Sequence, residues 1–188
     1  MIWALLESDV SGHLYKLWNR LSFGNYFPQP VKTVWIPKKG GGSRALGIPT
    51  LLDRIAQQVA KHRLEKQLEP LFHYSSFAYC SGMSAHDAVV RSQRNCFNHD
   101  FALDLYIQGY FDNINRALMT QALRHYCNDK WVHLYASRWL KADVMQEMEI
   151  RKRLTGTPLG YVISLLLANL FPCGLRQMNG QVPPQKAI

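Results

Sequence analysis

Three cations surround a glycine-rich turn in the first third of the chain. Lys38 and Lys39 precede a Gly-Gly-Gly run, and Arg44 follows it. Extended sequence lies on both sides, at 31–36 and 44–48, so the pattern predicts a hairpin with a flexible tip. Lysine and arginine neutralise phosphate charge, and a mobile basic tip can close over a polyanion. A solvated basic turn is the competing interpretation of these residues taken alone.

A second basic group lies on the helix that periodicity predicts over residues 51–68. We expect four cations on its outward face: Arg54, Lys61, Arg63 and Lys66. We expect the inward face to be made by Ile55, Val59, His62 and Leu64. Beside the basic hairpin, the outward face could follow an RNA backbone, whereas alone it would be read as a solvated surface.

The charge of the whole chain supports a polyanionic partner. Its 188 residues include 22 Lys and Arg against 13 Asp and Glu, which gives a net charge of +9 and a pI near 9.5. This balance favours nucleic acid over a membrane surface. The 47% apolar composition is sufficient for an ordinary domain with a hydrophobic core.

Other kinds of site find little support in the sequence. The four cysteines form no C-x-x-C pair and the seven histidines are dispersed, so neither a zinc site nor a disulfide framework is predicted. His86 and Asp87 are adjacent, but we expect them to cap a helix after Ser84 and not to perform catalysis. The chain start lacks the basic region of a signal peptide, and the apolar run 162–171 is too short to cross a bilayer. A cytoplasmic location is therefore expected.

Helical and extended segments alternate along the chain. Asp9 or Ser11 is expected to cap a helix on which Leu14, Leu17, Trp18 and Leu21 share one face. Further helices are predicted near 85–96, 116–126 and 131–140, and a short apolar strand at 101–107. Prolines around the first two strands predict that these lie at a sheet edge. From Pro172 onward the sequence is polar and without period, which predicts disorder.

Four blocks, in order and with matching spacing, resemble the reverse transcriptases and maturases encoded by group II introns. The first runs from KLWNRLSFGNYFPQPV through IPKKGGGSRALGIPTLLDRIAQ, and the second is SSFAYCSGMSAHDAV. The third is FALDLYIQGYFDNI and the fourth is GTPLGYVISLLLANLF. Together they cover about residues 17–171.

The resemblance implies an α+β fold that contains the fingers and part of the palm of a right-hand polymerase. The expected organisation is an N-terminal helical segment at 1–27, fingers at 28–100, partial palm at 101–171 and a disordered tail outside the family at 172–188. Such enzymes synthesise DNA on an RNA template with Mg²⁺ and assist splicing of intron RNA. The implied nucleotide-binding residues are Lys38, Lys39, Arg44 and Phe111.

The third block departs from the family where its chemistry resides. The family reads L-D-x-D-I-K-G-F-F-D, and its metal-binding aspartate corresponds to Tyr106 here. A phenol is neutral at pH 7 and a poor ligand for a hard cation. Asp104 would lie roughly 6.6 Å back along the strand, farther than the separation of about 3.5–4 Å between two catalytic metals. Asp112 matches a family aspartate interpreted as structural.

Further departures lie at positions that we interpret as functional in the family: Cys80, Ser81, Met83, Gln108, Leu159, Tyr161 and Leu165. The Y-A-D-D turn that supplies further carboxylates in the family does not occur after Phe171. We therefore expect no metal, no bound cofactor and no polymerase activity in this chain. Three alternatives follow: a non-functional relic, a residual RNA-binding module, or half of a split enzyme completed by a second polypeptide.

Overall fold

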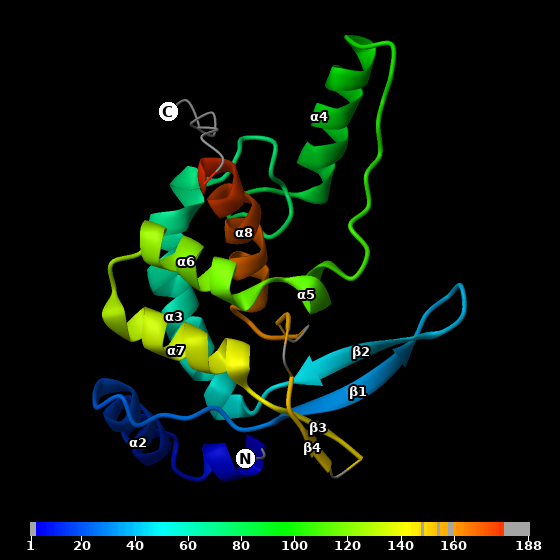
Figure 1. The fold of residues 1–188 in the computed structure, drawn as a ribbon. Helices are drawn as coiled ribbons and strands as arrows, with labels where there is room; N and C mark the ends of the chain where they lie inside the picture. Colours follow the sequence, from blue (N-terminus) through cyan, green and yellow to red (C-terminus); the bar gives the residue numbers. More distant parts are fainter. Residues whose placement is uncertain (1–2, 148, 154, 158–159, 179–188) are drawn as a thin grey trace.

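The computed structural model describes residues 3–147, 149–153, 155–157 and 160–178 and combines helices with one small sheet (Figure 1). Its elements in chain order are α1 (Trp3–Glu7), α2 (Val10–Ser22), β1 (Val31–Pro37), β2 (Ser43–Ile48), α3 (Leu51–Leu68), the single-turn helix η1 (Glu69–Leu71), α4 (Ala85–Phe97), α5 (Tyr110–Asn113), α6 (Arg116–Tyr126), α7 (Lys130–Lys141), β3 (Val144–Gln146), β4 (Glu149–Arg151) and α8 (Ser164–Met178). The predicted α+β class is confirmed.

The sheet has the strand order β2-β1-β3-β4. β1 and β2 form a long antiparallel hairpin, and β3 and β4 form a short one. The two hairpins meet through parallel pairing at the start of β1, where Val31 and Lys32 pair with Val144 and Met145. β2 is thus an edge strand as predicted, whereas β1 is internal at its first two residues. Beyond them the β1–β2 hairpin extends from the body of the molecule (Figure 1).

The hydrophobic core lies among α3, α6, α7 and α8, with α6 packed along α8. Its largest fully buried side chains include Tyr135 and Trp139 of α7 and Leu166, Leu167 and Leu170 of α8. Burial of each such side chain contributes roughly 1.5–3 kcal/mol relative to exposure. This packing holds the sheet and the ends of its strands in place.

The first long helix begins where the sequence predicts, but little of its apolar face is buried. The Asp9 carboxylate accepts a hydrogen bond from Gly12 N at 2.9 Å, as an N-cap does. Leu17 is buried and Leu21 packs against the core, whereas Trp18 is 60% exposed. The apolar face of α2 is therefore only partly buried, because one edge of the helix touches the body.

The predicted strand at 101–107 does not form. Its residues are extended but pair with no strand among the described residues, and they are exposed throughout. A strand requires a partner for its backbone N–H and C=O groups, and this segment runs beside α4 away from the sheet (Figure 1). The preceding helix α4 does begin at Ser84, which forms a capping box with Asp87.

The last helix continues past the predicted boundary. α8 runs through Pro172 to Met178, so disorder beginning at Pro172 was the wrong expectation for this part of the chain. The helix is already established by buried leucines before Pro172, so the hydrogen bond that this proline lacks does not end it. Residues 179–188, the rest of the predicted tail, lie outside the described residues. No described helix is both long and apolar enough to cross a membrane.

Candidate nucleic-acid interface

The three predicted phosphate-binding cations lie at the exposed end of the β1–β2 hairpin. Ile36 pairs with Arg44 and Pro37 with Ser43, which leaves Lys38 and Lys39 in the tip. A hydrogen bond of 3.0 Å from Lys38 N to Gly42 O closes the turn. Gly41 and Gly42 both have positive φ, which a glycine accepts without the steric cost of a side chain.

The cations of the tip are available to a ligand. Lys38, Lys39 and Arg44 are all exposed, and none forms an ion pair within the described part of the chain. Trp35, on the same hairpin, is 51% exposed. The structure thus exposes three unpaired cations and one aromatic side chain on a projecting element, with Arg44 on the opposite face of the hairpin from Trp35.

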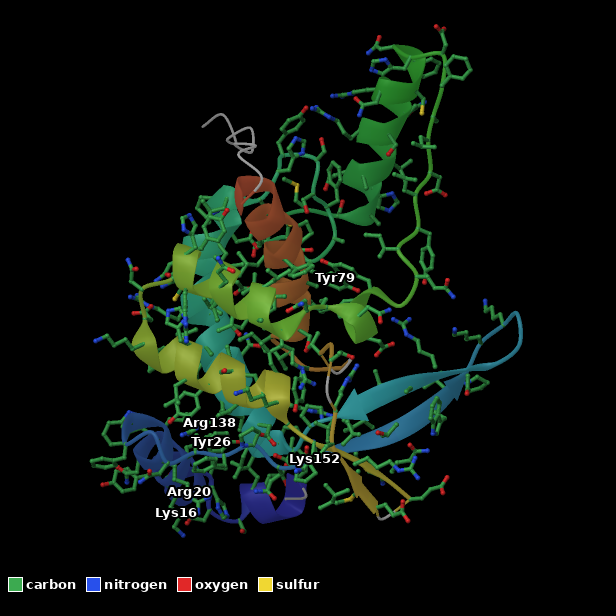
Figure 2. The ribbon with its side chains drawn as sticks, in the orientation of Figure 1. Lys16, Arg20, Tyr26, Tyr79, Arg138 and Lys152 are labelled. Carbon is green, nitrogen blue, oxygen red and sulfur yellow. The ribbon has the colours of Figure 1, made fainter. Side chains whose placement is uncertain are left out.

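A hollow of about 320 Å³ lies between the two hairpins. Its walls include Trp35 and Ala45 on one side and Gln146, Lys152 and Arg153 on the other. Lys152 is exposed and is labelled beside the sheet in Figure 2. Lys152 extends the positive surface to the base of the hairpin, whereas Arg153 pairs with Asp112, which also lines the hollow.

Arg116 fixes the segment that carries these two cations. Its guanidinium donates to three backbone carbonyls: Arg153 O at 2.6 Å, Gly156 O at 2.9 Å and Thr155 O at 3.1 Å. Burial lowers the pKa of Arg116, and the nearby Arg153 lowers it further. Several oriented carbonyl dipoles compensate this partly desolvated charge. The bends after β4 are therefore held to the start of α6.

The cations of α3 do not form the single outward face that was predicted. The buried stripe is Asp53, Ala56, Gln57, Ala60, Leu64 and Leu68. Val59, predicted to point inward, is 52% exposed, and His62 is exposed as well. The apolar side chains alone did not reveal which face of the helix is buried, because the buried face also includes the polar residues Asp53 and Gln57.

Two of the four α3 cations are engaged within the molecule. Lys61 pairs with Glu65 at 2.7 Å, and Arg63 pairs with Asp129 at 2.7 Å. The hydrogen bond from Arg63 lowers the pKa of the Asp129 carboxyl. At 3.6 residues per turn, Arg63 lies on the opposite side of the helix from Arg54. Arg54 and Lys66 are exposed and unpaired within the described residues, but they also lie on different sides.

The residues that correspond to the predicted metal position are far from a coordination site. Tyr106 is 90% exposed in the unpaired segment, and Asp104 is exposed in the same segment. Asp112 lies in α5, where its carboxylate accepts a hydrogen bond from Arg153 at 2.5 Å. Among the described residues, no group of three or more His, Cys, Asp or Glu side chains is arranged to hold a metal ion.

Phe111, predicted to contact a nucleotide sugar, is half-buried. Its ring packs edge-on against Tyr110 with centroids 5.7 Å apart, and its carbonyl accepts from Thr157 N at 2.8 Å. Its backbone is thus tied to Thr157, in the segment ahead of α8. Its contacts within the chain are those of a packing residue.

Two departures from the family that we interpreted as functional lie in the core. Cys80 is 6% exposed, and Tyr161 is 2% exposed near Asp53. Burial, followed by the Asp53 charge, raises the pKa of the Tyr161 hydroxyl. Both side chains fill space inside the protein. Leu159, another departure, lies outside the described residues.

Sequence reasoning missed the contribution of β3, β4 and the residues after them. β3 and β4 form a hairpin, and Lys152 and Arg153 follow it beside the hollow. The run Arg-Lys-Arg at 151–153 was a usable signal. Arg116 gave no such signal, because its role depends on carbonyl groups 37 to 40 residues away.

Comparison with known proteins identifies the family. A model described as reverse transcriptase (RNA-dependent DNA polymerase) matches residues 36–181. This chain belongs to that family, and its relatives place it with the proteins encoded by group II introns. The match extends to residue 181, whereas the predicted tail outside the family begins at 172.

Among its relatives is the group II intron-encoded protein LtrA of Lactococcus lactis subsp. cremoris, 31% identical over 83% of this chain and 26% of LtrA. Protein YkfC of Escherichia coli K12 is 30% identical over 88% of this chain and 45% of YkfC. A putative COX1/OXI3 intron 1 protein of Saccharomyces cerevisiae is 27% identical over 84% of this chain and 19% of its own. The chain thus spans between a fifth and a half of these relatives.

A solved structure has the same fold. It is titled a partial Cas6-RT-Cas1–Cas2 complex, and it matches 92% of this chain and 30% of its own with a TM-score of 0.58 at 23% identity. The likeness concerns the fold alone. With the family match, it shows that this chain has the fingers and part of the palm of a reverse transcriptase.

Proposed function

We propose that this chain does not polymerise nucleotides and that it binds RNA through the β1–β2 hairpin and the hollow beside it. The observation that carries the first half is Tyr106, which is 90% exposed where the family has a metal-binding aspartate. Two-metal phosphoryl transfer requires carboxylates that hold two ions about 3.5–4 Å apart. A neutral phenol on an unpaired segment does not meet that requirement.

The neighbouring carboxylates do not replace the missing one. Asp104 lies on the same exposed segment, and Asp112 is already engaged by Arg153. The residues present therefore do not fit the magnesium ions of the family. Completion by a separately encoded polypeptide would leave Tyr106 in place, so it would not restore this ligand.

RNA binding is supported by the position and freedom of the cations. Lys38, Lys39 and Arg44 project on a hairpin, and Lys152 continues the positive surface at its base. Phosphate contacts by such side chains release counterions and give affinity that falls steeply with salt. Trp35 offers a face on which an unpaired base can stack. Because several relatives are intron-encoded, intron-like structured RNA is the ligand class to test first.

Binding to a structured intron-like RNA should be measured across a salt series from about 50 to 200 mM. The double variant Lys38→Glu/Lys39→Glu is expected to weaken binding and to reduce the salt slope by about two. The matched control is Lys16→Glu/Arg20→Glu, an equal charge change on α2, away from the hairpin (Figure 2). Equal losses of RNA affinity in both variants, or equally weak binding to the RNA and to an unrelated duplex, would show that the hairpin does not bind RNA specifically.

Primer extension tests the first half of the proposal separately. With Mg²⁺, template, primer and nucleotides, we expect no template-dependent product from the purified chain. Synthesis that disappears on Asp104→Asn would overturn the assignment, because it would show that this aspartate supports catalysis. The binding assay and the extension assay can thus each disprove one half of the proposal without affecting the other.

A further inference from the structure

A second cavity lies outside the surface described above, between α4 and the loop that precedes it. Its volume is about 290 Å³. Two residues of the loop and four of α4 line it: Tyr74, Phe77, Asp87, Val90, Arg91 and Arg94. One continuous stretch of chain, residues 74–94, thus supplies both of its walls. We call this cavity the α4 pocket.

Both walls of the α4 pocket are held by contacts within the chain. The four α4 residues follow the spacing i, i+3, i+4, i+7, which places them on one face of the helix. The loop opposite is anchored by Phe72, which is 1% exposed, and by a hydrogen bond of 2.8 Å from Ser76 N to His73 O. The Tyr74 ring lies against the His73 ring with centroids 4.3 Å apart. The pocket therefore exists without a ligand.

Arg91 lacks an ionic or hydrogen-bonding partner for its side chain among the described residues. Its guanidinium carbon lies 4.7 Å from the centroid of the Tyr74 ring, a cation–π contact. Asp87 is four residues earlier on the helix, the spacing of an ion pair, but no ion pair joins the two. Arg91 Nε is buried and finds no acceptor in the part of the chain that the structure describes. A buried donor in this state is satisfied by water or by a ligand.

Arg94 adds a second cation to the same face of α4. Its side chain is exposed and forms no ion pair within the described residues. Residues three apart on a helix are neighbours, so its guanidinium can reach the same ligand as that of Arg91. Guanidinium groups bind phosphate through parallel N–H···O hydrogen bonds. This end of the pocket therefore has the chemistry of a phosphate site.

The other end of the pocket offers a hydrogen-bond acceptor. Asp87 Oδ2 accepts from Ser84 N at 2.8 Å and from Ser84 Oγ at 2.5 Å, whereas Oδ1 has no partner among the described residues. The hydrogen bonds from the Ser84 side chain and backbone lower the pKa of the Asp87 carboxyl, so it is charged at neutral pH. Along the helix axis Asp87 lies about 6 Å from Arg91 and about 10 Å from Arg94, at about 1.5 Å per residue. A free carboxylate oxygen at this separation from the cations can accept from a hydroxyl group of the same ligand.

We propose that the α4 pocket binds one unpaired ribonucleotide of an RNA. Arg91 and Arg94 bind its phosphate, and the half-buried Phe77 ring contacts its base. Asp87 Oδ1 accepts a hydrogen bond from the ribose 2′-hydroxyl, the group by which a protein distinguishes RNA from DNA. A site for a free anion would need neither the aromatic ring nor the carboxylate. The inference rests on the RNA binding proposed above and adds a second site for the same class of ligand.

A single-stranded oligoribonucleotide of about six residues tests this site apart from structured RNA. Arg91→Gln/Arg94→Gln is expected to weaken its binding to the 188-residue chain at least about tenfold, since charged hydrogen bonds are lost. The slope of log affinity against log salt should fall by about 0.7, the value for one phosphate of a single strand. Lys16→Gln/Arg20→Gln removes the same charge from α2 and is the matched control (Figure 2). Circular dichroism shows whether each variant keeps its helices.

The deoxyribonucleotide strand of the same sequence tests the contact with Asp87. It is expected to bind the unsubstituted chain roughly tenfold more weakly, because a hydrogen bond to a charged acceptor is absent. Asp87→Asn keeps an amide oxygen for the Ser84 backbone but removes the charge, so it should reduce the preference for RNA. Equal affinity of the unsubstituted chain for both strands would overturn the proposal.

A photoreactive base locates the bound strand. Iodouridine in the oligoribonucleotide is expected to cross-link to Phe77 or Tyr74, which peptide mass spectrometry identifies. The same cross-link should form in the Lys38→Glu/Lys39→Glu variant, so failure of the hairpin as an RNA site would leave this result unchanged. No binding of the oligoribonucleotide, an equal loss in the α2 control, or cross-links confined to the hairpin would overturn the proposal.

Discussion

Arg153 donates a hydrogen bond from Nη2 to Oδ1 of Asp112 at 2.5 Å and so joins the end of β4 to α5. The arginine side chain is 19% exposed and the aspartate 65% exposed, so the pair lies at the surface of the hollow and not beneath it. The aspartate corresponds to a family residue that we interpreted as structural, and this contact agrees with that role. It also removes one cation from the set that is free to bind phosphate.

Asp112→Asn is therefore expected to strengthen RNA binding. It removes a negative charge beside Lys152 and releases Arg153, which should raise affinity about two- to five-fold at low salt. The free energy of unfolding should fall by less than about 1 kcal/mol, because the Asp112 carboxylate is largely exposed. Glu7→Gln on α1 makes the same charge change elsewhere. Equal gains in RNA affinity from both variants would mean that only net charge matters.

Arg116→Ala is expected to destabilise the protein. Three carbonyl groups, those of Arg153, Thr155 and Gly156, lose their charged donor. Hydrogen bonds to charged groups contribute about 1.5–3 kcal/mol each and are not additive, so we expect a loss of roughly 2–3 kcal/mol in urea unfolding. Arg124→Ala, at an exposed position of the same helix, should change stability by less than about 0.5 kcal/mol. A similar small effect for both would show that the clamp is unimportant.

The helices were predictable because their signals are local. Asp9 and Ser84 are N-caps, and the helices after them begin where periodicity placed them. Which face of α3 is buried was not predictable. That face includes Asp53, whose carboxylate accepts a hydrogen bond of 2.5 Å from the Tyr26 hydroxyl, 27 residues away. The sequence of 101–107 is that of a strand, but strand formation depends on a partner that the described chain does not supply. Local sequence signals thus predicted where elements begin better than they predicted what each element packs against.

The candidate site divides in the same way. The cations of the hairpin tip could be identified from Lys38, Lys39 and Arg44 beside three glycines, because a turn exposes its own side chains. The α3 cations could not be assigned, since the partners of Lys61 and Arg63 are a helix neighbour and Asp129 from another helix. Lys152 lies near the hairpin only because β3 pairs with β1 in the sheet. Non-local pairing decides which exposed charges are free.

Alkaline pH is expected to weaken the fold through the half-buried Tyr110. Burial raises the pKa of Tyr110 to about 12, and its neutral hydroxyl donates to Ala168 O at 2.8 Å. The unfolded tyrosine titrates near pH 10, so this stabilisation is complete below about pH 10 and is lost as pH rises toward 12. Urea midpoints at several pH values should show this decline.

Tyr110→Phe separates this effect from the titration of lysines. The variant should lose about 0.5–1.5 kcal/mol near neutral pH with its hydrogen bond. Its stability should then decline less steeply above pH 10 than that of the unsubstituted protein. Tyr15→Phe, at a ring that is 61% exposed, should follow the unsubstituted protein. Parallel profiles for all three proteins would exclude Tyr110 as a source of the alkaline loss.

Gly160→Ala tests the contact between the hairpin base and the segment that leads into α8. Gly160 has a φ of +108°, and a Cβ there would lie 2.1 Å from Gly47 O in β2. The Gly47 backbone and the Leu46 side chain leave no room for it, so we expect a loss of roughly 2–4 kcal/mol in urea unfolding. Gly40→Ala is the matched control, because a Cβ at that hairpin position meets nothing within 4 Å. It should change stability by less than about 0.5 kcal/mol. Equal stability of the two variants would show that β2 is not held by this close approach, and that the hairpin base can move away from α8.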